Sequence, residues 1–239
     1  MKVLVMLWHE IYTDLFQELH DGIIVVGQKL PTEAVLSKRF SANRHTVRRA
    51  LSQLRSDGLV HTKRGRGTIA VAPPLTYRIG RKTRFSTNLD STASIAGISI
   101  LHMLTRLSSE SEARILHFGK SEAIHYVEGL RLRDGRPLLH FTSIFPARRV
   151  GDLLIHLNDG LSITQALAAS GIDDYERKKT RITARIASER MAGHLEIYAG
   201  DPVLVVKRLN TLPDGTIIES GHSTMAGDRI ALVVDGDRN

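Results

Sequence analysis

The sequence predicts an α+β protein with two domains: a helical N-terminal domain that ends in a short β-hairpin, and a larger domain with helices on an antiparallel sheet. Three observations support this. Residues 11–56 carry apolar side chains at helical spacing, the excess positive charge lies in the first third of the chain, and a hairpin pattern recurs at an offset of 77 residues. The expected domains are residues 1–72 and 84–239, joined by a linker at 73–83 that opens with two prolines.

The composition is that of a globular protein. The 239 residues are 42% hydrophobic and 24% charged, which excludes disorder as the main state. The chain has no cysteine, so a disulfide scaffold, a thiolate metal site and a cysteine nucleophile are excluded. No stretch approaches the roughly 20 apolar residues of a membrane span, and the start lacks a signal-peptide pattern. We therefore expect a cytoplasmic protein.

The net charge of +8 is unevenly distributed. Residues 1–82 hold 14 basic and 6 acidic side chains, whereas residues 83–239 hold 19 of each. Such asymmetry is typical of an N-terminal domain that binds a polyanion, joined to a neutral partner domain. A merely solvated basic face would have the same composition, so the choice between these two interpretations depends on the sequence motifs.

Three helices are expected in the N-terminal domain. Ile11, Leu15 and Leu19 recur every four residues and form the apolar stripe of the first helix. Thr32 is the expected N-cap of a second, short helix at residues 33–39, whose buried side is Leu36 and Phe40.

The third helix is expected to begin after the N-cap Asn43, run to about Ser56 and end at Asp57-Gly58. Its core stripe has i, i+3, i+4, i+7 spacing and consists of Val47, Ala50, Leu51 and Leu54. Strands at 59–62 and 68–72 then flank a basic loop at 63–67, which indicates a β-hairpin. Two short helices at a tight turn followed by a basic hairpin make a winged helix-turn-helix.

The exposed side of the third helix carries Arg44 and His45 in the first turn and Arg48 one turn later. The DNA major groove is about 12 Å wide and admits one helix, whose N-terminal residues meet base edges. Arginines in the hairpin tip fit a narrow minor groove. The residues expected to contact DNA are Arg44, His45, Thr46, Arg48 and Arg49 in the helix and Arg64, Gly65 and Arg66 in the tip.

The segment at residues 30–71, LPTEAVLSKRFSANRHTVRRALSQLRSDGLVHTKRGRGTIAV, resembles the DNA-binding domain of the GntR family of bacterial repressors. The resemblance covers residues 11–72 without a gap. It implies a dimeric regulator that binds a near-palindromic operator. One position departs from the family, which often has arginine after the glutamate of its LP-[ST]-E motif, where this chain has Ala34.

The second domain contains the recurring pattern. Each copy has a helix-like segment opened by Ser-Glu, at 111–112 and at 188–189, then a β-rich run, a turn and a returning strand. The turns are Asp134-Gly135 and Pro213-Asp214-Gly215, and Asp-Gly between apolar runs is a hairpin signal. Further helices are expected at 150–156 and 162–169 and a strand at 179–187. A chance likeness of two hairpins is the alternative.

This half resembles the UTRA effector domain, which has a chorismate-lyase-like fold and follows the winged helix in the HutC branch of the GntR family. The residues that carry the resemblance lie at 84–89 and 180–185. Within that branch the likeness is strongest to repressors of phosphonate-utilisation operons, which the segment at 43–50 also resembles.

Arg131 and Arg133 alternate on an expected strand, so both would project from one face and suit a phosphate or carboxylate. The resemblance implies a small anionic effector held by Arg131, Arg133 and Ser162, in a pocket lined by Arg84, Phe85, Ser86 and Asn88. The arginines could instead be exposed or paired with Glu122, Glu128 or Asp134. Two departures, Phe141 and Met225, stand where many relatives have glutamate and tyrosine.

We therefore expect a homodimeric transcriptional regulator, most simply a repressor, that needs no cofactor and no metal and is not an enzyme. Its partners would be double-stranded operator DNA and a phosphonate or phosphate ester. His117 and His125 are better explained as structural than as metal ligands. The alternative is a small-molecule enzyme or sensor of chorismate-lyase-like fold with a basic N-terminal interaction domain.

Overall fold

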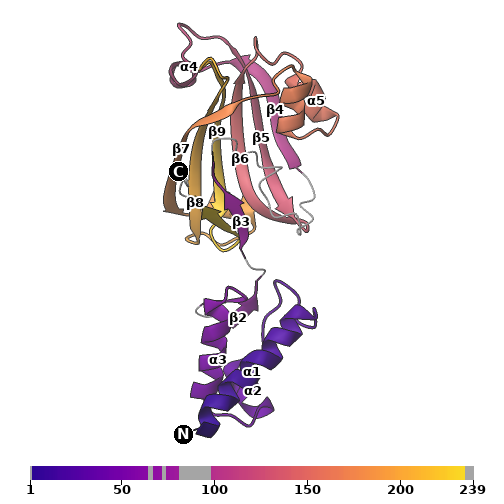
Figure 1. Ribbon diagram of the computed structural model, residues 1–239, viewed down its shortest axis with the longest axis vertical. Helices are drawn as coiled ribbons and strands as arrows, with labels where there is room; N and C mark the ends of the chain where they lie inside the picture. The colour runs from indigo at the N-terminus through magenta and orange to yellow at the C-terminus, as the bar shows by residue number, and fades with distance from the viewer. Residues whose placement is uncertain (1, 64–66, 72–73, 81–97, 235–239) are drawn as a thin grey trace. The chain divides into compact units, whose positions relative to one another are not determined.

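The computed structural model describes residues 2–63, 67–71, 74–80 and 98–234. The chain divides into two compact units, Met1–Pro74 and Leu75–Asn239 (Figure 1). Among the described helices, none combines the length and the apolar character that crossing a membrane requires.

The N-terminal unit contains three helices and a two-stranded hairpin, as the sequence predicts. The elements are α1 (Lys2–His20), α2 (Glu33–Arg39), α3 (Arg44–Ser56), β1 (Val60–Lys63) and β2 (Gly67–Ala70). The stripes on α1 and α3 meet in one core, where Ile11, Leu15, Leu36, Val47 and Leu54 are buried. Phe40 packs at the edge of this core and is only partly buried.

The turn between α2 and α3 is fixed by helix caps. The side chain of Thr32 accepts a hydrogen bond from the backbone N–H of Val35, and Asn43 accepts one from Thr46 at 2.8 Å. The hydroxyl of Thr46 also donates to the Asn43 side chain at 2.9 Å. Asn43 thus satisfies a backbone donor that α3 would otherwise leave unpaired at its N-terminus.

We expect Asn43→Ala to lower the free energy of unfolding of this unit by about 0.5–2 kcal/mol, because the cap and the Thr46 hydroxyl lose their common acceptor. Urea denaturation followed by circular dichroism measures the change. Asn43→Ser keeps a capping oxygen and should recover most of the loss. Equal losses for alanine and serine would contradict a capping role.

The C-terminal unit is built on a six-stranded antiparallel sheet with the order β4-β5-β6-β9-β8-β7. The strands are β4 (Ile98–Leu107), β5 (Ala123–Arg133), β6 (Arg136–Pro146), β7 (Glu176–Ile186), β8 (Pro202–Thr211) and β9 (Ile217–Ala226). The helices are α4 (Glu110–Leu116), α5 (Leu153–Asn158), α6 (Ile163–Ala169) and α7 (Glu189–Leu195).

The recurring sequence pattern corresponds to a structural repeat. The order β4, α4, β5, β6 is followed later by β7, α7, β8, β9, and the two copies meet where β6 pairs with β9. The two predicted hairpins are confirmed. The strand β4, which opens the first copy, was not predicted, because its partly exposed residues lack a clean alternation of buried and exposed positions.

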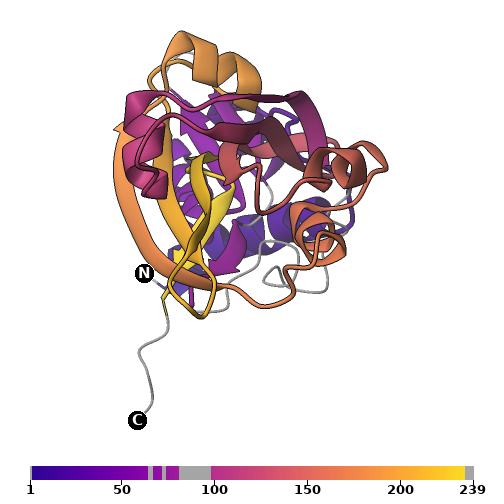
Figure 2. The same cartoon turned by 90° about the horizontal axis from the view of Figure 1, so that it is seen from above.

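The helices cover both faces of the sheet (Figure 2). Leu153, Leu157 and Leu167 of α5 and α6 join the main core on one face. On the other face, Leu116 of α4 and Leu195 of α7 belong to two smaller apolar clusters, one at each helix. The middle of that second face is polar, with Glu128, Thr142 and His222 side by side on β5, β6 and β9.

A second, two-stranded parallel sheet corrects the predicted linker. Leu75–Arg78 forms β3, which pairs with β10 (Ile230–Val233) near the end of the described chain. Leu75 and Tyr77 are buried in the main core of the C-terminal unit. Part of the expected linker at 73–83 is therefore a strand of the second domain, and its alternating apolar residues were the overlooked signal.

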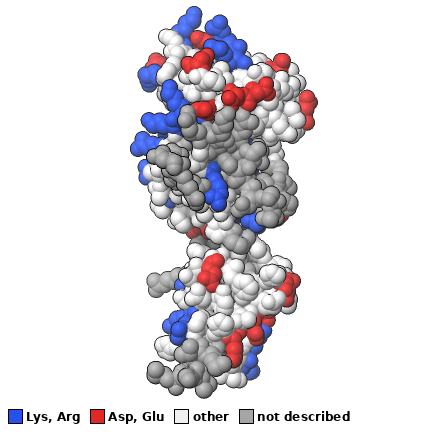
Figure 3. Space-filling view, viewed as in Figure 1, with Lys and Arg blue, Asp and Glu red and all other residues white. Residues whose placement is uncertain are grey.

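The edge strand β7 carries five basic side chains: Arg177, Lys178, Lys179, Arg181 and Arg185. Lys and Arg side chains gather along the left edge of this unit in Figure 3, where Figure 1 shows β7. Positive charge on an edge strand opposes pairing with a strand of another chain. This unit can therefore be neutral overall and still have a strongly basic edge.

Candidate functional site

The helix α3 presents a basic face. Arg44, His45 and Arg48 are exposed, whereas Thr46 is only 5% exposed because its hydroxyl lies against Asn43 in the N-terminal cap. In this structure Thr46 holds the start of the helix, and its contact with DNA stays a prediction. The three exposed residues remain candidates for base and phosphate contacts.

Arg48 is held in place by the helix before it. Its guanidinium donates two hydrogen bonds to Glu33 of α2, from Nε to Oε1 at 3.2 Å and from Nη2 to Oε2 at 2.9 Å. This hydrogen bonding raises the pKa of Arg48 and lowers the pKa of Glu33. The glutamate of the LP-[ST]-E motif therefore orients an arginine of α3 across the turn.

Arg49 lies at the edge of the exposed face. Its guanidinium carbon is 4.5 Å from the ring centre of Trp8 in α1, a cation–π contact that ties α3 to α1. Arg64, Gly65 and Arg66 lie outside the described residues, and so do Arg84, Phe85, Ser86 and Asn88.

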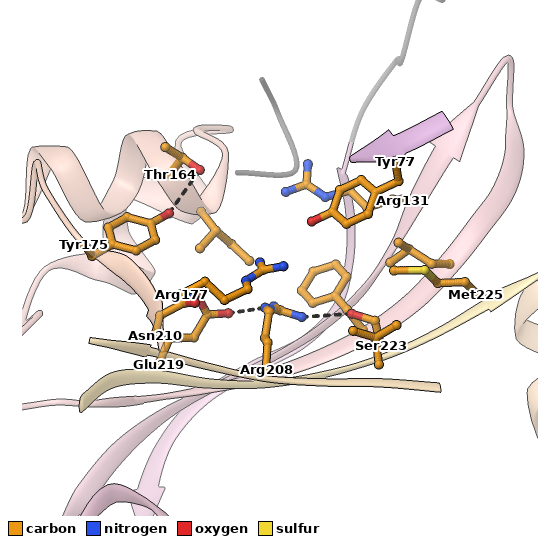
Figure 4. Close-up of a pocket in the computed structure, with 14 residues that line it drawn as sticks. Tyr77, Arg131, Thr164, Tyr175, Arg177, Arg208, Asn210, Glu219, Ser223 and Met225 are labelled. Atoms are coloured by element: carbon orange, nitrogen blue, oxygen red, sulfur yellow. Dashed lines mark hydrogen bonds and ion pairs between the residues drawn. The ribbon is translucent and has the colours of Figure 1, made fainter. Parts of the chain in front are cut away.

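A hollow of about 600 Å³, its open mouth included, lies on the α5–α6 face of the C-terminal sheet. Its charged lining consists of three arginines and one glutamate: Arg131 of β5, Arg177 of β7, Arg208 of β8 and Glu219 of β9. Figure 4 shows the three guanidinium groups directed toward the same space. Tyr77, Thr164, Tyr175, Asn210 and Ser223 add polar groups.

Arg208 and Glu219 form a buried, hydrogen-bonded pair. Nη2 of Arg208 lies 2.6 Å from Oε1 of Glu219, whose side chain is 4% exposed. Burial by itself would raise the pKa of Glu219, but the charge of Arg208 and hydrogen bonds from Ser143 and Arg208 outweigh it, and the pKa is lowered. The pair stays ionised, and Arg208 also donates to Ser143 and Ser223.

Gly221 makes room for this arginine. It pairs with Arg208 across β8 and β9, and a Cβ atom on Gly221 would come within 2.3 Å of the guanidinium carbon. The missing side chain at Gly221 thus leaves the space that the guanidinium of Arg208 occupies. A larger residue at this position would force the Arg208 side chain to move.

Arg131 is another charged group of the lining that is largely buried. Burial, and next the positive charge of Arg208, lower its pKa to about 10. Its guanidinium carbon lies 5.9 Å from the ring centre of Phe141. Phe141 and Met225, the two positions at which the resemblance implies a departure from many relatives, both line the hollow.

Of the described residues predicted to bind the effector, Arg131 lines the hollow, and Arg133 and Ser162 do not. The sheet register shifts between Arg131 and Leu132, and Arg133 lies at the last pair before the turn, 3.7 Å from Asp134. The Ser162 hydroxyl is occupied as the N-cap of α6, in a capping box with Gln165. Arg177, Arg208 and Glu219 were not predicted.

The architecture defines a class of protein. A helix-turn-helix with a basic second helix, joined to a domain with an arginine-lined pocket, is the organisation of a DNA-binding transcriptional regulator.

Comparison with known proteins agrees with this class. The model of the family "Bacterial regulatory proteins, gntR family" matches residues 7–69, and the UTRA domain model matches residues 96–231. The chain is 32% identical to the probable transcriptional regulator PhnF of Escherichia coli over 85% of this chain and 83% of that protein. It is 29% identical to the transcriptional repressor NagR of Bacillus subtilis, over 97% and 95% respectively.

The crystal structure of PhnF from Mycobacterium smegmatis has the same fold, with a TM-score of 0.67 and 23% identity over 96% of this chain and 100% of that one. The chain belongs to the GntR family of bacterial transcriptional regulators, in the branch that carries a UTRA effector domain. Its relatives are regulators rather than enzymes, which removes the alternative of a chorismate-lyase-like enzyme.

Proposed function

We propose that the protein represses genes for the uptake or breakdown of a phosphonate or a related metabolite. It binds a near-palindromic operator as a homodimer, and a small anion in the arginine-lined pocket changes its affinity for DNA. The observation that carries the proposal is that three guanidinium groups are directed into one pocket, with one carboxylate, that of Glu219, among the lining residues that the structure describes.

The DNA-binding part rests on α3. In a two-fold symmetric dimer, the two copies of Arg44, His45 and Arg48 would enter successive major grooves about 34 Å apart. In the absence of DNA, Arg48 is hydrogen-bonded to Glu33. On DNA, a phosphate or base would compete with Glu33 for the same guanidinium group.

The charge of the pocket favours a dianion. Among the described residues of the lining, three guanidinium groups accompany one carboxylate, and a phosphonate or phosphate monoester can bind several guanidinium groups at once better than a carboxylate ligand can. Phosphorus-bound oxygens also offer three acceptors to guanidinium groups that enter from three different strands. The resemblance to repressors of phosphonate-utilisation operons supports the same ligand class.

Asn210 suggests a second feature of the effector. Its amide nitrogen donates to Glu219 at 2.7 Å, and because a carboxylate only accepts, this bond fixes the orientation of the amide. The amide oxygen is buried and has no hydrogen-bond partner among the described residues. An effector with a hydroxyl or amino group beside its anionic end would supply the missing donor.

The route from the pocket to DNA runs through β3. Tyr77 lines the pocket, and β3 begins directly after Pro74, where the N-terminal unit ends. An effector that contacts Tyr77 therefore acts on the segment that leaves the DNA-binding unit. The effector changes operator affinity only if it binds the DNA-competent and the DNA-incompetent states of the dimer with different affinities.

We expect Arg131→Ala to lose the effector response while keeping operator binding, because Arg131 lines the pocket of the C-terminal unit whereas α3 belongs to the N-terminal unit. Arg133→Ala is the matched control: it removes the same charge from the same strand outside the pocket. Thermal shift with a panel of alkylphosphonates, aminoalkylphosphonates, phosphate esters and carboxylates is the measurement. A ligand at a hundredfold excess over its Kd should stabilise the wild type by about 2.7 kcal/mol.

Gel shifts with DNA from upstream of the gene and of its neighbouring operon complete the test. The wild type and Arg133→Ala should change operator affinity with the same ligands, and Arg131→Ala should not. The proposal fails if only carboxylates shift the melting temperature, or if Arg131→Ala responds like the wild type.

A further inference from the structure

The polar middle of the second sheet face, opposite the arginine-lined pocket, contains a group of potential metal ligands. Glu128 of β5 and His140 of β6 are buried, and His194 of α7 is half-buried. One ligand atom from each residue lies within 4.8 Å of the others. Nε2 of His140 is 2.7 Å from Oε1 of Glu128, and the rings of His140 and His194 are stacked with their centres 4.8 Å apart.

We propose that Glu128, His140 and His194 form a binding site for a divalent transition-metal ion, with Zn²⁺ the best fit. Two imidazoles and one carboxylate are a common ligand set for this ion when its fourth position is left to water. The group is distinct from the arginine-lined pocket, since it lies on the other face of the sheet and shares no residue with it.

The geometry requires only a small adjustment. Tetrahedral Zn²⁺ with bonds of about 2.0–2.1 Å holds its ligand atoms about 3.4 Å apart. The pair of Glu128 and His140 must open slightly from 2.7 Å, and the widest separation of 4.8 Å must close. His194 makes the larger movement, because its side chain is half-buried on a surface helix whereas the other two lie in the sheet.

A neighbouring tyrosine orients the carboxylate of the proposed site. The hydroxyl of Tyr126 donates to Oε2 of Glu128 at 2.9 Å, which orients the carboxylate. An ion between Oε1 of Glu128 and Nε2 of His140 would take the place of the hydrogen bond that joins these two atoms. Burial raises the pKa of Tyr126 to about 12, so this donor keeps its proton. Burial lowers the pKa of His140, although the hydrogen bond with Glu128 acts in the opposite direction. Because the carboxylate of Glu128 only accepts, Nε2 is the donor in this bond, and metal binding at Nε2 requires the tautomer that is protonated at Nδ1.

Other charged groups face the same site. Arg190 lies 3.8 Å from Oε1 of Glu128 and opposes a cation there, but its side chain is 79% exposed and can turn into solvent. The exposed imidazoles of His102 and His222 lie on the same face, because each pairs with a residue of the row that contains Glu128 and Thr142.

An ion here would join α7 to β5 and β6. The same two strands carry Arg131 and Phe141 on their other face, in the effector pocket. Metal binding would therefore stiffen one wall of that pocket.

The test uses the full chain without a histidine tag, stripped of metal with a chelator. Isothermal titration with ZnCl2 and thermal shift measure binding, and Co²⁺ added in place of Zn²⁺ reports tetrahedral coordination by its visible absorption. We expect one saturable site per chain in the wild type. His194→Ala and Glu128→Gln should each weaken binding at least about tenfold. His156→Ala, which removes a histidine from α5, should leave it unchanged.

Binding should also weaken as the pH falls, because protons compete for the imidazoles. Absence of saturable Zn²⁺ binding by the wild type would overturn the proposal. So would a His194→Ala variant that binds as tightly as the wild type. If Glu128→Gln fails to fold, His194→Ala still decides, because its side chain lies on a surface helix.

Discussion

Arg44→Ala and Arg48→Ala should each weaken operator binding by about 1–3 kcal/mol, which raises the Kd roughly 5- to 150-fold. Both side chains lie on the exposed face of α3, and Glu33 holds Arg48 in a fixed position. A residue that contacts a base also contributes specificity, so its variant should discriminate less between operator and unrelated DNA. Fluorescence anisotropy at several salt concentrations measures both effects.

Arg114→Ala is a suitable control for this experiment. It removes the same charge from α4 of the other unit, where Arg114 is 75% exposed and only 3.9 Å from Glu110. Its Kd should match that of the wild type within about twofold. Operator binding like that of the wild type by the Arg44/Arg48 double variant would exclude α3 as the recognition helix.

The second large effect is expected for Glu219→Gln, which should destabilise the C-terminal unit by about 3–5 kcal/mol. The substitution keeps the shape of the side chain but leaves the buried guanidinium of Arg208 without its counter-charge, and breaking one partner of a buried pair costs about this much. Urea denaturation is the measurement. Glu110→Gln, at an exposed ion pair, should cost less than about 1 kcal/mol.

The loss should depend on pH in a defined direction. The pKa of Glu219 is lowered in the folded protein, so its contribution to stability is present above the unfolded value of about 4.3 and is lost as the pH falls through the folded pKa. The difference in the free energy of unfolding between the wild type and Glu219→Gln should therefore become smaller below about pH 4. A difference below about 1 kcal/mol at neutral pH would show that Arg208 does not depend on Glu219.

The N-terminal unit was predictable because its signals are local. Thr32 and Asn43 cap their helices as expected, since a cap involves residues only three positions apart. The role of Thr46 in the N-terminal cap was not predicted, because its neighbours in the sequence are exposed. Only the helix phase, which turns the side chain of Thr46 toward the core, separates it from Arg48.

The pocket was harder to predict because it is assembled from distant strands. Arg131 was predicted from the alternation of residues on its strand. Arg208 could have been predicted as well, since it occupies the equivalent position 77 residues later in the recurring pattern. Glu219 and Arg177 gave no comparable signal. Their roles depend on which strands are neighbours, and the order β9-β8-β7 follows from long-range pairing that local patterns do not contain.

The pairing of β3 with β10 has a consequence for how the protein is made. Leu75 pairs with Ile230, so the stretch that leaves the DNA-binding unit meets its partner only 155 residues later in synthesis. In a chain whose helix-turn-helix folds early on the ribosome, β3 therefore has no partner strand until residue 230 has been made. Truncated products of a stop codon after β3 and before residue 230 would keep the recognition helix and lose β10, the partner of the strand through which a metabolite could control it.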